Sequence, residues 1–295
     1  MFLINIALGA AGLAAGLRLL PRDAGDRAVS IDALGSALLA ACMLGLLFGL
    51  IQGSTDGWTA VPVAALAAGV IFFAAFAQRQ RTAAAPLIKP SLLRNRGFTA
   101  GLILGLVFFA TVAGLLYAVS LFLQRGVGYS PERAAVTGFA PMAAGIVVAS
   151  VLCMNLITRL GRTLSLAGIA IAVAGTGWLL AIVAHDGTSA SAAVLAPAMA
   201  VIGLGMGAAF GTLYDIAIGD IDPAEAGSAS GSLSSVQQLA NALGPAIVTS
   251  IYFGALAGGQ VHAMTVSLLA VIGIGVASAL AVPLLPRKPP ADAGH

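Results

Sequence analysis

Long apolar stretches separated by short polar segments fill the whole sequence. A helix that crosses a bilayer needs about 20 apolar residues, and each of these stretches is long enough to do so. We predict nine spans, at Phe2–Leu20, Ile31–Gln52, Thr59–Ala77, Phe98–Leu123, Ala134–Thr158, Thr163–Ala184, Ala190–Tyr214, Gly227–Leu256 and His262–Leu285. The pattern therefore predicts an all-α integral membrane protein with about nine transmembrane helices.

The longest polar interruption, Gln78–Gly97, holds five basic residues and no acidic one. Basic residues next to membrane spans stay on the cytoplasmic side, so this loop orients the spans around it. If the nine spans alternate strictly, twelve of the 14 Lys and Arg residues lie on that side and only Arg125 and Arg133 lie on the other. The charge pattern thus predicts a multi-pass protein of the cell membrane, with its N-terminus outside and its C-terminus in the cytoplasm.

Composition excludes a soluble domain. Charged residues make up 8% of the chain, hydrophobic residues 59%, and the mean hydropathy is +1.01, whereas about a quarter of a soluble domain is charged. The net charge of +3 lies beside the spans, so it does not indicate nucleic-acid binding. Arg18 follows the first apolar stretch instead of preceding it, which is the opposite order to that of a signal peptide.

The sequence shows no set of residues for catalysis. The three histidines lie in loops or at the terminus, and Cys42 and Cys153 lie inside apolar stretches as packing residues. We find no nucleophile–base set, metal-ligand spacing or phosphate loop, so we expect neither an enzyme nor a bound cofactor or metal. The middle third of every predicted span lacks charged residues, so no internal proton-carrying carboxylate is predicted.

The most polar span is the eighth, and its polar residues share one helix face. Gln237, Gln238, Asn241 and Pro245 recur at three- and four-residue steps. Pro245 has no N–H for the carbonyl of Asn241, so a kink is expected there. Two interpretations of the stripe remain open: it lines a transport path, or its amides form hydrogen bonds between helices.

Glycines at four-residue steps predict close helix packing. The predicted packing positions are Gly203, Gly207 and Gly211 in the seventh span and Gly227 and Gly231 in the eighth.

The fourth and fifth spans supply further candidates. Gln124 ends the fourth span and is either a gate or substrate contact or a solvated helix end. Tyr117 on the same span is also predicted as a substrate or gate contact. Ser130 and Pro131 have the residue types of a helix start, and Pro141 predicts a kink because it leaves the Thr137 carbonyl without a donor.

Several phrases along the chain resemble the major facilitator superfamily, specifically its fourteen-span drug:proton antiporters. They are Phe2–Gly9, Asp32-x-x-Gly35, Gly57-Trp58, Pro86–Arg96, Leu123-Gln124 with Gly128–Pro131, Leu160-Gly161-Arg162, Gly227–Gly231 and Gln238–Gly244. Of these, Leu123-Gln124 with Gly128–Pro131 is the most specific, and Ala7 replaces a proline that is usual in the family.

The resemblance implies a domain plan. Residues 1–20 would be the last span of an N-terminal half whose first five spans would precede Met1. Residues 21–97 would be two linker spans and the basic cytoplasmic loop, residues 98–286 the C-terminal six-span half, and residues 287–295 a cytoplasmic tail.

The resemblance also implies a function. We expect a secondary transporter that exports small amphipathic compounds or drugs, conferring antibiotic resistance, with the proton gradient as its energy source. Its expected partners are the lipid bilayer, the small-molecule substrate and the missing N-terminal half, with no nucleic acid. The alternatives are a non-transporting membrane remnant and one subunit of a split transporter.

Overall fold

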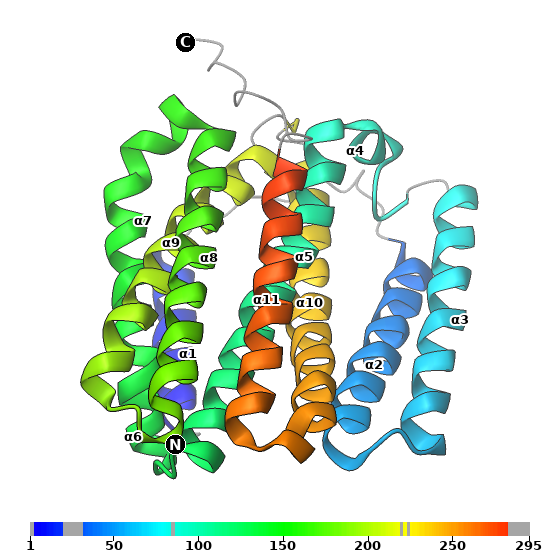
Figure 1. Ribbon diagram of the computed structural model, residues 1–295. Helices are drawn as coiled ribbons and strands as arrows, with labels where there is room; N and C mark the ends of the chain where they lie inside the picture. The colour runs from blue at the N-terminus through cyan, green and yellow to red at the C-terminus, as the bar shows by residue number, and fades with distance from the viewer. Residues whose placement is uncertain (1–2, 20–31, 84–85, 219–220, 223–224, 283–295) are drawn as a thin grey trace. The chain divides into compact units, whose positions relative to one another are not determined.

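The computed structural model describes residues 3–19, 32–83, 86–218, 221–222 and 225–282 (Figure 1). These residues are almost entirely helical and include no strand, which confirms the predicted all-α fold. The chain divides into two units, Met1–Ile31 and Asp32–His295, which are described separately. The predicted tail, residues 287–295, lies outside the described residues.

The first unit contains one helix, α1 (Leu3–Leu19), within the first predicted span. Its 17 residues extend about 25 Å at 1.5 Å per residue, less than the roughly 30 Å hydrocarbon core of a bilayer. The first predicted span, Phe2–Leu20, therefore stays a prediction.

In the second unit, eight helical segments are long and apolar enough to cross a membrane, among the described residues. They match the second to ninth predicted spans. Their helices are α2 (Ala33–Asp56), α3 (Ala60–Thr82), α5 (Arg96–Leu121), α7 (Ala140–Leu160), α8 (Arg162–Asp186), α9 (Ala192–Ile218), α10 (Ala226–Ala255) and α11 (Gln260–Ala281).

Short helical pieces connect or extend these helices. They are α4 (Pro90–Arg94), α6 (Pro131–Ala134), the π-helical turns η1 (Phe122–Gly126) and η2 (Ala135–Phe139), and the 3-10 turns η3 (Gly187–Ser189) and η5 (Leu256–Gly258). The predicted helix start at Ser130 is confirmed, because its hydroxyl accepts a hydrogen bond from the Arg133 amide at 3.3 Å.

Within the second unit the long helices pack in an order that differs from their order in the chain. α9 packs against both α7 and α8, α5 packs against α10, and α11 contacts α8, α5 and α10 (Figure 1). α2 and α3 form a hairpin, whose α2 helix contacts α10. The largest buried apolar cluster, which includes Phe122, Met199, Ile202 and Tyr252, joins the six helices from α5 to α11.

Glycines bring α9 very close to both of its neighbours. At Gly207 an added Cβ would lie 2.5 Å from the carbonyl oxygen of Ile146 on α7, and at Gly203 it would overlap the carbonyl of Met142. On the other side, a Cβ at Gly168 of α8 would lie 2.6 Å from the backbone nitrogen of Ala209. These backbone contacts leave no room for a side chain, so glycine is required at each position.

Candidate functional site

A polar face of α10 is exposed in the second unit. Ser234, Gln238 and Asn241 are exposed, and Gln237 and Pro245 at the edge of the same face are half-buried. The opposite face of the helix is packed: Leu233 and Ala240 are buried, and Gly244 meets the carbonyl of Ala110 on α5. Packing against α5 therefore holds the predicted polar stripe outward.

Exposed amides on a membrane helix indicate a particular environment. Gln238 and Asn241 lie near the middle of the 33-residue span Ala226–Gly258, where lipid would offer their amides no hydrogen-bond partner. The face that carries them therefore suits a water-lined cavity or a polar protein surface better than hydrocarbon.

Tyr117 and Gln124 lie on the helix next to α10. α5 and α10 run in the same direction, because Gly105 lies nearest Leu233 and Gly114 lies nearest Val248. Tyr117, which is 41% exposed, follows the Gly114 contact by one turn. Gln124 is exposed in η1, and its Nε2 donates to Ser120 Oγ at 2.7 Å.

The structure thus places the polar candidates on two adjacent helices but at different heights. Asn241 precedes Gly244 by one turn, whereas Tyr117 follows the level of that glycine and Gln124 lies two turns further on. Among the described residues, no hydrogen bond connects Tyr117 or Gln124 to the α10 amides. In the described part of the chain, the polar candidates are therefore spread along two adjacent helices and are not gathered in one compact site.

The two predicted kink prolines lie in different settings. Pro141 is the second residue of α7, the helix that directly follows the π-helical turn η2. Pro245 lies inside α10, where its carbonyl accepts the Thr249 hydroxyl at 2.6 Å. Both kinks stay predictions. A third proline, Pro197, lies inside α9 and was not predicted as a kink, although it is visible in the sequence as a proline in an apolar stretch.

The predicted packing glycines also fall into two groups. Gly203 and Gly207 make the backbone contacts with α7 that their spacing predicts, and Gly211 is half-buried. Gly227 and Gly231 differ, because no atom of a neighbour lies within 4 Å of a Cβ built at either position. They border a cavity of about 780 Å³ between α10 and the α2–α3 hairpin.

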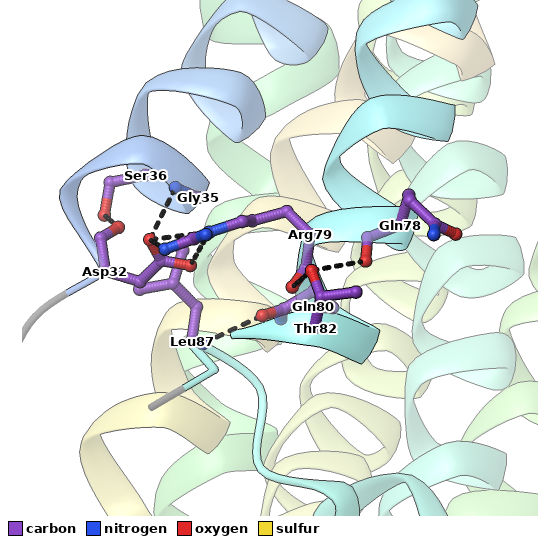
Figure 2. A network of polar contacts seen from close by, with 8 residues as sticks. All are labelled: Asp32, Gly35, Ser36, Gln78, Arg79, Gln80, Thr82 and Leu87. Atoms are coloured by element: carbon purple, nitrogen blue, oxygen red, sulfur yellow. Dashed lines mark hydrogen bonds and ion pairs between the residues drawn. The ribbon is translucent and has the colours of Figure 1, made fainter. Parts of the chain in front are cut away.

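A polar network closes the hairpin at the end where α2 begins and α3 ends (Figure 2). Arg79 Nη2 lies 3.0 Å from Asp32 Oδ1, and Arg79 Nε lies 3.1 Å from Asp32 Oδ2. Asp32 also caps α2 by accepting from the Gly35 amide at 3.1 Å. The hydrogen bonds from Arg79 and then Gly35 hold the pKa of Asp32 below its ordinary value.

The carboxylate of this network is well shielded, with only 3% of the Asp32 side chain exposed. The neighbouring residue Gln80 accepts a hydrogen bond from the Leu87 amide at 2.9 Å, which attaches the following segment to α3. The pairing of Asp32 with Arg79 was not predicted from the sequence. The sequence could have indicated this pair, because it places an acid at the start of a predicted helical hairpin and a base at its end, and these two positions meet at the open end of the hairpin.

A second set of contacts joins this segment to α10. Lys89 Nζ lies 3.5 Å from Glu225 Oε1, and the Ser91 hydroxyl donates to the same carboxylate at 2.8 Å. The Ser228 hydroxyl donates to the carbonyl of Leu87. Two residues of the predicted basic loop, Arg79 and Lys89, are therefore paired with acids, and the loop is attached to both α2 and α10.

The family model described as Major Facilitator Superfamily matches residues 2–245. The chain is 36% identical over 261 residues to the probable actinorhodin transporter of Streptomyces coelicolor, covering 87% of this chain and 45% of that protein. It is 30% identical over 277 residues to puromycin resistance protein pur8 of Streptomyces alboniger, covering 88% of this chain and 54% of that protein. It is 31% identical over 284 residues to the lincomycin resistance protein of Streptomyces lincolnensis, covering 96% of this chain and 58% of that protein.

The chain therefore spans about half the length of the curated relatives it matches. The family match covers most of the chain, and it agrees with the eight apolar helices and with the fold that the sequence predicts. The relatives are named for export and resistance, which points to transport and away from enzymatic catalysis. The chain belongs to the major facilitator superfamily and is a multi-pass membrane protein of a transporter family.

Proposed function

We propose that this protein forms part of an exporter of small amphipathic compounds, antibiotics among them, in the cell membrane. The observation that carries the proposal is the exposed polar face of α10, with Gln238 and Asn241 on an otherwise apolar bundle. The names of the relatives support the substrate class, because they include the probable actinorhodin transporter and proteins of puromycin and lincomycin resistance.

In this proposal the face formed by α5 and α10 is one wall of the transport path. Transporters of this kind hold the substrate between two bundles, which rock around it to open on alternate sides. Gln238 and Asn241 would bind polar groups of the substrate midway along the path. Tyr117 and Gln124 would contact it nearer to η1, and the opposite wall would come from helices outside this chain's α2–α11 unit.

Export would be driven by the proton gradient, with the N-terminus outside and the C-terminus in the cytoplasm. The basic residues support this orientation, because they concentrate in the segment Gln78–Gly97. The paired acids among the described residues include Asp32, Asp186 and Glu225, and all three lie at helix ends. The proton-carrying group is therefore expected on the helices that complete the path.

Export from a bacterial host that lacks its own drug exporters tests the proposal. The chain is expressed together with the helices that complete a relative, and loss of a fluorescent amphipathic dye from the cells is measured. Gln238→Ala and Asn241→Ala are expected to slow export about tenfold. Ser250→Ala is the control, because Ser250 is exposed on the same helix but its hydroxyl already donates a hydrogen bond to the backbone carbonyl of Ala246.

Normal export of every tested compound by both stripe variants would show that the stripe does not contact substrate. The same assay separates the alternatives. Export that needs a second chain favours a subunit of a split transporter. A chain that exports nothing in any combination, although it is folded and inserted, favours a non-transporting membrane protein.

A further inference from the structure

The cavity beside the α2–α3 hairpin is a long slot. Its volume is about 780 Å³, and its walls come from α2, α3, α5 and α10. The four sides include Met43 of α2, Phe73 of α3, Leu102 of α5 and Leu239 of α10. Neither Gln238 nor Asn241 of the polar stripe lines the slot.

The lining suits hydrocarbon. Among the described residues that line the slot, none is charged. The hydroxyls of its serines are already used: Ser232 donates to the carbonyl of Ser228 at 2.8 Å and Ser235 to that of Gly231 at 3.0 Å. Water in a cavity needs two to four polar partners, so an apolar occupant fits these walls better than water does.

The slot is open to the surface and extends along α2 for about the depth of one leaflet. Val70 and Phe73 of α3 line it and are 59% and 55% exposed. Along α2 the lining runs from Ser36 to Leu46, about 15 Å of helix. This length is half of the roughly 30 Å hydrocarbon core, and it begins in the first turn of the span.

Two basic residues lie at the end of the slot where α2 begins, and each is paired with an acid, Arg79 with Asp32 and Lys89 with Glu225. Arg79 follows the lining residue Phe76 by one turn, and Lys89 follows the lining residue Ile88. The Lys89 side chain is 46% exposed although it lies 3.5 Å from Glu225. Basic residues at a membrane surface attract anionic headgroups.

We propose that this slot binds one acyl chain of an anionic phospholipid, whose headgroup lies near Lys89. The chain enters between the exposed residues of α3 and runs parallel to α2 and α10. The bound lipid fills the space between the hairpin and α10 at the level where Gly227 and Gly231 leave α10 without a side chain.

Native mass spectrometry of the purified full chain tests the proposal. The protein is exchanged into mixed micelles with equal amounts of phosphatidylglycerol and phosphatidylcholine, and the lipid retained after detergent washing is counted. The wild type is expected to retain one phosphatidylglycerol. Gly231→Leu and Ala40→Leu, which fill the slot from opposite walls, are expected to lower retention at least fivefold.

Gly273→Leu is the matched control, because Gly273 is also a helix glycine with nothing within 4 Å of its Cβ position but does not line the slot. It is expected to retain lipid like the wild type. Lys89→Gln is expected to lower the preference for phosphatidylglycerol while a lipid stays bound. Using two filling variants keeps the test decisive if one of them does not fold.

The proposal is overturned if the wild type retains no lipid, or if both filling variants retain as much as the control. It is also overturned if an amphipathic dye, added to the micelles, occupies the slot in place of lipid. Because the readout is bound lipid, it is independent of export: either the exporter proposal or the lipid site can fail without the other.

Discussion

Individual glycines on this bundle have opposite roles that spacing alone does not reveal. Gly203 and Gly231 both belong to four-residue glycine repeats. A Cβ at Gly203 would overlap a backbone carbonyl of α7, whereas a Cβ at Gly231 would meet nothing within 4 Å. The repeat is read from the sequence, but the neighbour that it faces depends on how the helices assemble.

This difference predicts opposite effects on stability. Gly203→Ala is expected to lower the free energy of unfolding by about 1–3 kcal/mol, because the backbone of α7 has to move. Gly231→Ala is expected to leave it unchanged or raise it by up to about 1 kcal/mol, because alanine favours helix over glycine. Thermal unfolding in one detergent measures both, and equal losses for the two variants would contradict the packing described.

The Asp32–Arg79 pair predicts a pH dependence of stability. The folded pKa of Asp32 is lowered, so its contribution is fully present above the ordinary value of 3.8 and is lost as pH falls through the folded pKa below that value. At pH 7 the melting temperature of the wild type is expected to be higher than that of the Asp32→Asn variant. The two melting temperatures are expected to converge below pH 3.8. Parallel curves over the whole pH range would contradict a charged pair.

At the scale of elements, the lengths of the apolar runs predicted eight of the long helices well. α3 is an instructive difference: it was expected to end at Ala77 but continues to Thr82. Hydropathy could not show this, because the added turn is polar and is held by hydrogen bonds to residues outside the helix. Arg79 bonds Asp32, 47 residues earlier, and Gln80 bonds the Leu87 amide. The π-helical turns η1 and η2 likewise have no signature in the apolar pattern.

The polar stripe of α10 was also predictable, because its period is that of a helix. Its exposure was not, because that depends on which face of α10 packs against α5. The slot beside α2 could not be predicted either, since its walls come from four helices.

Substitution of Pro245 tests how this proline affects the stability and the role of α10. Pro245→Ala would give the Asn241 carbonyl a backbone donor, so we expect the helix to gain roughly 1–3 kcal/mol of stability. If the proline shapes the polar face for transport, export of dye is expected to fall in the same variant. A more stable variant with unchanged export would show that the kink is not needed.

At the scale of the whole molecule, the proposed orientation requires nine alternating spans, and eight helices of the described residues are long and apolar enough to span. Reporters of sidedness fused to the two ends of the chain are expected to signal on opposite faces of the membrane. Signals from the same face would mean an even number of spans, and the proposed orientation would then be wrong.

The most direct test of the central claim is the reactivity of Asn241→Cys toward a water-soluble maleimide. It is measured in the export-competent assembly, with Cys42 and Cys153 replaced by serine. Ile71→Cys is the comparison, since Ile71 is 67% exposed near the middle of α3. We expect the cysteine on α10 to react at least tenfold faster and to be protected by an exported compound. Equal, slow reaction at both positions would contradict a water-lined path along α10.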